Sequence, residues 1–169
     1  MPPPSANDRI HRSLLDKLAT DRYEGTASGS LDAYLGTVLR DLCWLLNSVR
    51  LSETVDLEPY PEVKTSVINY GWIDLIGSMV TEERLPAFVG GLRRSLLDFE
   101  PRLNKASLRT RLLERRGVDR IMFAIQGELV VEPMSYLLLI QTEFDTSHGI
   151  ARVTGDIKPR RSASGYEAS

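Results

Sequence analysis

Apolar side chains recur every three or four positions in the first two thirds of the chain and every second position afterwards. The first helical stripe is short and narrow, and it ends before the polar, glycine-containing stretch 20–29. Its apolar members are Ile10, Leu14, Leu15 and Leu18. The pattern predicts a peripheral helix that either packs on its own domain or docks on a partner through Leu14, Leu15 and Leu18, and it favours neither interpretation.

A longer stripe predicts a second helix that begins after Ser30 as N-cap, with Asp32 in its first turn. The expected buried face consists of Leu31, Tyr34, Leu35, Val38, Leu39, Leu42, Leu45 and Leu46. Residues 47–61 contain two prolines and break the pattern, which predicts a loop. The segment 60–71 then predicts one or two helical turns closed by Gly71.

A third helix is predicted from an N-cap at Thr81 to the stop imposed by Pro101. Its apolar face consists of Leu85, Phe88, Val89, Leu92, Leu96 and Phe99. The pair Gly90 and Gly91 inside this helix costs roughly 1 kcal/mol per glycine against alanine. We therefore expect a close helix or sheet contact there.

From residue 104 the period changes to two, which predicts four strands. They are expected at 104–112, 121–131, 136–145 and 150–157, with turns at 115–119 and 147–149 and a bulge or close approach at Gly127. The expected fold is α+β, with the N-terminal helices on one face of a mainly antiparallel sheet of about four strands. The expected division is a helix and flexible linker at 1–29, the α+β domain at 30–157, and a disordered tail at 158–169.

Composition narrows the class of protein. The chain has 169 residues, of which 42% are hydrophobic and 26% charged, and a net charge of −2, so it lacks the basic excess typical of nucleic-acid binders. A single cysteine cannot form an internal disulfide, and no apolar run is long enough to span a bilayer. We expect a cytoplasmic protein without an export signal, membrane insertion or nucleic-acid partner.

Residues with catalytic or ligating chemistry are sparse. His11 and His148 lie far apart in sequence, and Cys43 lies within a leucine-rich helix, where a free cysteine is usually a core residue. We expect no metal, no cofactor and no catalytic residue. The arginines between 102 and 120 indicate either a solvated strand face or an acidic protein partner.

The segment Glu100-Pro101-Arg102-Leu103 breaks a local rule, because Glu100 places a negative charge at the negative end of a helix dipole. Such departures are frequent at functional or specially supported sites. The simpler interpretation is a helix stop with a surface ion pair worth about 0–1 kcal/mol.

Four blocks of the sequence together resemble the TssE family of type VI secretion baseplate proteins. They are Arg12 to Leu18, Val38 to Asn47, the pair of segments 60–63 and 66–71, and Glu100 to Leu103, which matches the family's EPRL motif. The resemblance covers about residues 13–157. It is specific because all four blocks occur in the family's order and spacing.

The resemblance implies a structural subunit similar to the wedge protein of contractile phage tails. The implied partners are the wedge subunits TssF and TssG, with TssK nearby, and the first ring of the TssB–TssC sheath, in the bacterial cytoplasm near the inner membrane. The implied partner-binding residues are Glu100, Pro101, Arg102 and Leu103. The implied sheet mimics the strand-exchanging domain of the sheath, so that sheath assembly starts on it.

The alternative is a glycoside hydrolase acting on peptidoglycan, because the family carries a lysozyme-like label. That reaction needs two carboxyl groups flanking a cleft, one of them protonated. Asp98 and Glu100 are expected to splay from a helix end, and Arg102 beside Glu100 favours the carboxylate over the protonated acid. We therefore favour a structural subunit over an enzyme. A third alternative is a small adaptor that shares the fold but not the machine.

Overall fold

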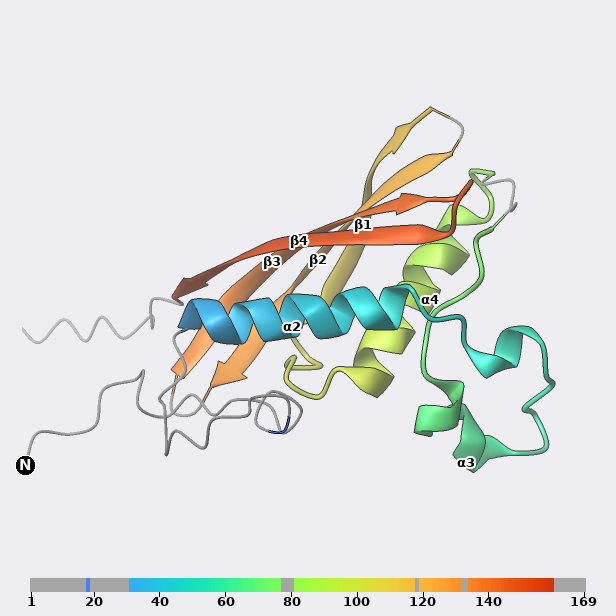
Figure 1. Ribbon diagram of the computed structural model, residues 1–169, viewed down its shortest axis with the longest axis horizontal. Coiled ribbons are helices and arrows are strands. Elements are labelled where there is room, and N and C mark those ends of the chain that lie inside the picture. Colours follow the sequence, from blue (N-terminus) through green and yellow to red (C-terminus); the bar gives the residue numbers. More distant parts are fainter. Residues whose placement is uncertain (1–17, 19–30, 77–80, 118, 132–133, 160–169) are drawn as a thin grey trace, which may run out of the picture.

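The computed structural model describes residue 18 and residues 31–76, 81–117, 119–131 and 134–159 (Figure 1). Of the predicted docking helix only Leu18 is described, with 75% of its surface exposed, and Leu14 and Leu15 lie outside the described residues. The predicted cap Ser30 also lies outside them.

Four strands form one sheet in the order of the sequence. They are β1 (Arg109–Arg116), β2 (Arg120–Val131), β3 (Met134–Asp145) and β4 (Ile150–Pro159), and each pairs antiparallel with the next. Gly117 after β1 and Gly149 before β4 have the positive φ angles that tight turns require. The predicted antiparallel sheet of four strands is therefore confirmed.

Two long helices cover one face of this sheet. Helix α2 (Leu31–Leu46) packs along β4 and α4 (Leu85–Phe99) packs along β1 (Figure 1). Between them the chain makes three short helical segments: η2 (Leu51–Glu53), α3 (Pro61–Lys64) and η3 (Val67–Asn69). The predicted α+β arrangement is confirmed, because both helices contribute to the same core cluster as the inner face of the sheet.

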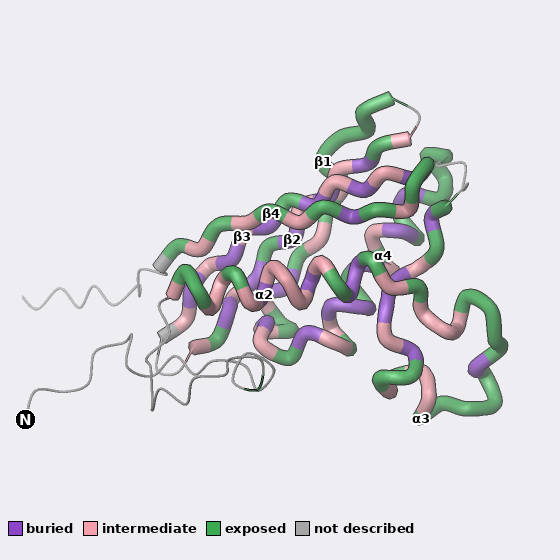
Figure 2. The backbone as a smooth tube through the Cα atoms, viewed as in Figure 1, coloured by how far each residue is buried: buried purple, intermediate pink, exposed green. Residues whose placement is uncertain are grey.

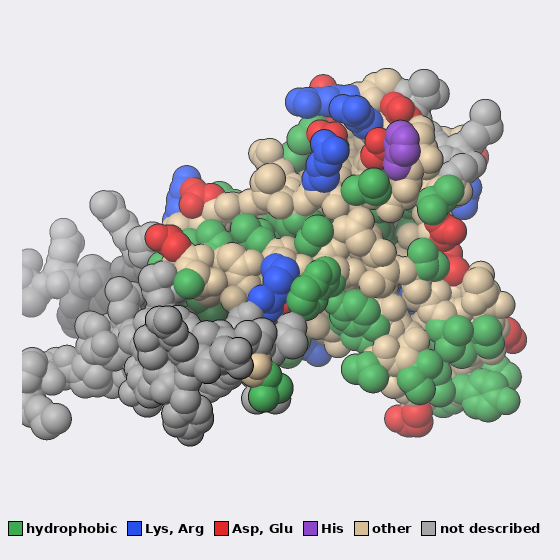
Figure 3. Space-filling model, in the orientation of Figure 1, with side chains coloured by type: hydrophobic (Ala, Val, Ile, Leu, Met, Phe, Trp, Pro, Cys, Tyr) green, Lys and Arg blue, Asp and Glu red, His purple; other side chains and the backbone are tan. Residues whose placement is uncertain are grey.

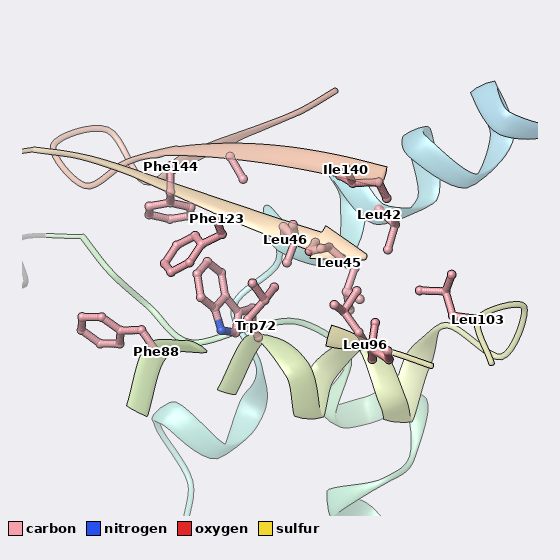
Figure 4. Close-up of a cluster of buried hydrophobic side chains, with 14 of the residues drawn as sticks. Leu42, Leu45, Leu46, Trp72, Phe88, Leu96, Leu103, Phe123, Ile140 and Phe144 are labelled. Atoms are coloured by element: carbon pink, nitrogen blue, oxygen red, sulfur yellow. The ribbon is translucent and has the colours of Figure 1, made fainter. Parts of the chain in front are cut away.

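Trp72 is fully buried and lies between the helices and the sheet (Figure 4). Its ring meets Phe123 and Phe144 edge to face, with centroids 5.7 and 5.3 Å apart. Along β2 buried residues alternate with intermediate or exposed ones, and the colour of the tube changes accordingly from residue to residue (Figure 2). A Cβ atom added to Gly91 would lie 3.4 Å from the Trp72 Nε1, whereas one on Gly90 would meet nothing within 4 Å. The close contact predicted at the glycine pair therefore involves Gly91 alone.

The predicted turns before Gly71 are also confirmed. Gly71 has φ 132°, and a Cβ atom there would lie 2.4 Å from the Ser48 carbonyl oxygen. Only glycine fits this position without displacing the backbone.

Several predicted boundaries were wrong. Helix α4 begins at Leu85, four residues after the predicted cap Thr81, because Pro86 in its first turn sets the start. The first strand begins at Arg109, since Asn104 folds residues 104–107 into a turn by accepting the Ala106 N–H at 3.1 Å.

Two further differences lie within the sheet. The pairing of β2 with β3 runs through Gly127 without a bulge, and the irregularity lies in β1 between Leu112 and Glu114. Gly127 instead marks a close approach to Leu103 and Leu108. Strand β4 continues to Pro159, two residues beyond the predicted end.

Candidate functional site

The EPRL segment forms the corner between α4 and β1. The Glu100 N–H still donates to the Leu96 carbonyl at 3.0 Å, and Pro101 then prevents the helix from continuing. Beyond the corner the backbone joins the end of β2, because the Val130 N–H donates to the Arg102 carbonyl at 3.2 Å. Leu103 is 3% exposed and pairs with Leu129 in an isolated bridge. The motif therefore anchors the helix to the sheet.

Glu100 is buried, with 3% of its surface exposed. Its Oε1 accepts the Arg102 backbone N–H at 3.2 Å and the Arg102 Nε–H at 2.6 Å, and its Oε2 accepts the Arg102 Nη2–H at 2.5 Å. The simpler expectation of an exposed ion pair was wrong. The charge that opposes the helix dipole is neutralised by a two-point guanidinium contact inside the motif.

Asp41 on α2 extends this ion pair into a cluster. Its Oδ2 lies 2.9 Å from the Arg102 Nη2, and its Oδ1 accepts hydrogen bonds from Arg40 at 2.9 and 3.1 Å. Burial by itself lowers the pKa of Arg102, but its hydrogen bonds to Glu100 and the charges of Glu100 and Asp41 outweigh that effect and raise the pKa above its usual value. The cluster therefore ties α2 to the end of α4.

Two tyrosines stand beside the cluster. The Tyr70 hydroxyl donates to the Asp41 carbonyl at 3.3 Å, and its ring meets Phe99 edge to face at 5.4 Å. Burial, and then the charges of Asp41 and Glu100, raise the pKa of Tyr70. Burial also raises the pKa of Tyr34, an effect that the positive charge of Arg102 partly opposes.

A hollow of about 390 Å³ opens over this cluster. Its lining combines the ion-pair residues with an apolar wall: Arg40, Asp41, Trp44, Leu45, Tyr70, Phe99, Glu100, Pro101 and Arg102. Trp44 is 48% exposed, and the Arg40 guanidinium lies 4.8 Å from its ring centroid. Figure 3 shows basic and hydrophobic side chains together over α2. An exposed aromatic and a cation over a rigid base can bind another protein surface.

The structure thus brings the four EPRL residues together but divides their roles. Glu100 and Leu103 are buried, and Pro101 and Arg102 line the hollow. Arg40, Asp41 and Trp44 were not predicted as site residues from the sequence. The signal was present, because Trp44 is a large aromatic residue on the polar side of the helical stripe.

Other candidate chemistry is limited in the described residues. They contain no group of three or more His, Cys, Asp and Glu side chains placed to hold a metal ion, and none of their helices is long and apolar enough to cross a membrane. His148 pairs with Asp145 at 3.1 Å in the turn after β3, and His11 lies outside the described residues. Cys43 is half-buried against β4.

The two carboxyl groups considered for hydrolysis differ in setting. Asp98 is exposed, whereas both oxygens of Glu100 are engaged by Arg102. A carboxylate held in this way serves as an anchor for a cation.

The α+β domain therefore carries a corner whose charged side chains, Asp41, Glu100 and Arg102, are paired with one another. Residues 32–134 match the family model for baseplate wedge protein gp25, a family that includes TssE. The chain therefore belongs to the gp25 baseplate wedge family and is a TssE-like baseplate protein. No curated protein and no solved structure matches it.

Proposed function

We propose that the chain is the TssE subunit of a type VI secretion baseplate. In this role it joins the wedge subunits TssF and TssG, with TssK nearby, and helps to start the first ring of the TssB–TssC sheath in the bacterial cytoplasm. The observation that carries the proposal is the EPRL corner, a rigid ion-pair cluster beneath a hollow with an exposed Trp44.

The geometry supports separate roles within the motif. Glu100 is a positioning residue, because it is buried and holds the Arg102 guanidinium against Asp41. Arg102 and Pro101 present the surface of the hollow, together with Trp44 and Arg40 from α2. We propose that a wedge or sheath subunit docks there against the exposed ring of Trp44.

Co-purification from cells that assemble the machine tests this proposal. TssF and TssG are expected to accompany the tagged chain, and Trp44→Ala and Arg102→Ala are expected to abolish sheath assembly seen by fluorescence microscopy. Val130→Ala is a matched control, because Val130 is exposed to a similar extent (47%) and lies outside the hollow. Retention of normal sheath assembly by both hollow variants would refute the role of the site. Absence of TssF and TssG would refute the baseplate assignment to this machine.

A further inference from the structure

A long connection leads from α2 to Trp72, and both of its ends are fastened to each other. The Trp72 N–H donates to the Ser48 carbonyl at 2.8 Å, and the Arg50 N–H donates to the Trp72 carbonyl at 3.0 Å. Between these contacts lies the segment that we call the 50–71 loop, which contains η2, α3 and η3 and projects away from the sheet (Figure 1). Connections of this length are uncommon in compact domains and often bind something.

A buried asparagine ties the three short helices of the 50–71 loop together. The Asn69 Oδ1 accepts the Ser52 N–H of η2 at 2.9 Å, and the Asn69 Nδ2 donates to the Lys64 carbonyl of α3 at 2.8 Å. Within η3, the Ser66 Oγ accepts the Ile68 N–H at 3.3 Å. The loop is therefore ordered before any partner arrives, which lowers the entropy lost on binding.

Apolar side chains lie on the outside of this loop. Val67 is 82% exposed, Ile68 66% and Tyr60 59%, and we call these three residues the apolar tip. Tyr60 directly precedes α3, and the other two belong to η3, which packs against α3. Single exposed apolar residues are ordinary, but a group of them on an ordered loop with a buried asparagine adds little to folding. Such a group is typical of an interaction site.

The charges around the apolar tip define the chemistry of its partner. The 50–71 loop contains four acidic residues and two basic ones. Both bases are already paired, Arg50 with Glu53 at 2.7 Å. Lys64 pairs with Glu58, also at 2.7 Å. Glu62 in the first turn of α3 is exposed and has no ion pair with any other described residue. Figure 3 shows hydrophobic side chains gathered over α3, with acidic side chains at their margin.

An acidic margin disfavours two of the possible occupants. Two copies that met tip to tip would bring their Glu62 carboxylates together, and like charges repel. An anionic lipid surface would repel the same carboxylates. A helix with an apolar face bordered by lysine or arginine matches both the tip and its margin, because long basic side chains can reach outward beside an apolar face.

We infer that the apolar tip binds a basic amphipathic helix of another baseplate subunit. This surface is separate from the hollow over the EPRL corner, because none of the three tip residues lines that hollow. The inference rests on the proposed function for the source of the helix, and it adds a second contact surface and the chemistry of its partner.

A helix-forming peptide and the purified full chain test the tip directly. The probe is Leu-Lys-Lys-Leu-Leu-Lys-Leu-Leu-Lys-Lys-Leu-Leu-Lys-Leu, whose leucines share one helical face. The control is the same peptide with glutamate in place of lysine. The chain is expected to bind the lysine peptide at least about tenfold more tightly in calorimetry, and the NMR signals of Val67 and Ile68 are expected to shift.

Two variants with matched controls separate the apolar contribution from the charge. The double variant Val67→Ser, Ile68→Ser removes the tip, and Val130→Ser changes an exposed apolar residue on β2. Glu62→Lys reverses the margin, and Glu82→Lys makes the same change at an exposed acid before α4.

The double variant and Glu62→Lys are expected to weaken lysine-peptide binding at least about tenfold, and the two controls to leave it within about twofold. Because the replaced side chains are exposed, all four chains are expected to unfold within about 2 °C of the unaltered one. Glu62→Lys covers the case in which the double variant fails to fold.

In cells, the double variant is expected to lose sheath assembly and Val130→Ser to retain it. Equal binding of both peptides, or normal sheath assembly by the double variant, would overturn the inference. Two further results would overturn it by naming another occupant. One is a dimer of the free chain in analytical ultracentrifugation that the double variant abolishes, and the other is binding to phosphatidylglycerol vesicles that it abolishes.

Failure of TssF and TssG to co-purify with the unaltered chain would instead overturn the proposed function. The two failures are distinguishable, because peptide binding is measured on the purified chain alone.

Discussion

At the scale of single residues, the central feature is a buried carboxylate that is fully engaged by one arginine. Glu100 opposes the helix dipole, and the guanidinium of Arg102, two positions away, compensates for it at 2.5 and 2.6 Å. Proline between them ends the helix and turns the chain so that the two side chains meet. The motif is therefore a self-contained corner whose stability depends on its charges.

Glu100→Gln is expected to lower the free energy of unfolding by about 2–3 kcal/mol, because it leaves the partly buried Arg102 with one carboxylate instead of two. Urea denaturation measures this change. Asp98→Asn is the matched control at the same helix end, where the exposed side chain predicts a change within about 0.5 kcal/mol. Equal losses for the two variants would contradict the buried role of Glu100.

Because the pKa of Tyr70 is raised, we expect the free energy of unfolding to depend on pH in the alkaline range. The pKa of Tyr70 is raised above its usual 10.0, so the folded chain retains a phenolic proton that the unfolded chain has lost. The free energy of unfolding should therefore fall as the pH rises from about 10 through the higher folded pKa. Urea midpoints between pH 9 and 11 measure this slope, and Tyr70→Phe is expected to make it shallower. An unchanged slope would show that Tyr70 does not contribute.

At the scale of elements, glycines mark where helices and loops approach one another. Gly71 is required by its positive φ and by the Ser48 carbonyl, whereas a side chain at Gly91 would make an ordinary contact with the Trp72 indole and one at Gly90 would face open space. The same residue type thus has different consequences at three nearby positions. The apolar periodicity of the sequence predicted helix α4 but could not distinguish Gly90 from Gly91. The two glycines differ in the residues that pack against them, and these come from distant parts of the chain.

Gly90→Ala is expected to stabilise the fold by about 0.5–1 kcal/mol, because alanine restricts the unfolded chain and favours helix without a clash. Gly71→Ala is expected to destabilise it by about 2 kcal/mol or more, because the added methyl meets backbone atoms at 2.4 Å. Thermal unfolding of both variants measures the difference. A gain from Gly71→Ala would contradict the conformation of this turn.

At the scale of the whole molecule, two tryptophans report on different parts of the protein. Trp72 is fully buried in the core, and Trp44 is 48% exposed above the ion-pair cluster. Because one tryptophan lies in the core and the other lines the proposed docking hollow, substituting each in turn should separate folding from assembly.

Trp72→Ala is expected to cost about 3–5 kcal/mol of stability, as for other large core aromatics. Trp44→Ala is expected to leave the unfolding free energy within about 1 kcal/mol and to weaken binding to wedge subunits at least about tenfold. Urea denaturation and pull-down titration measure the two effects. Normal binding by Trp44→Ala would place the docking surface elsewhere.

The sequence by itself determined the α+β class, the four antiparallel strands and the two long helices, because periods of 3.6 and 2 report directly which face of an element is buried. It also identified Glu100-Pro101-Arg102-Leu103, because a misplaced charge is a local property. The start of α4 and of β1 could not be predicted, since proline placement and the Asn104 turn compete with the apolar pattern.

Only the tertiary structure decided which groups meet. It placed Asp41 against Arg102 across 61 positions of the chain, buried Glu100, and laid α2 along β4. The physical reason is that a local pattern records the burial of one face, whereas ion pairs and covered edges depend on where distant elements pack. The EPRL motif and an ion pair within it could be predicted from the sequence, but the burial of Glu100 and the contact with Asp41 could not.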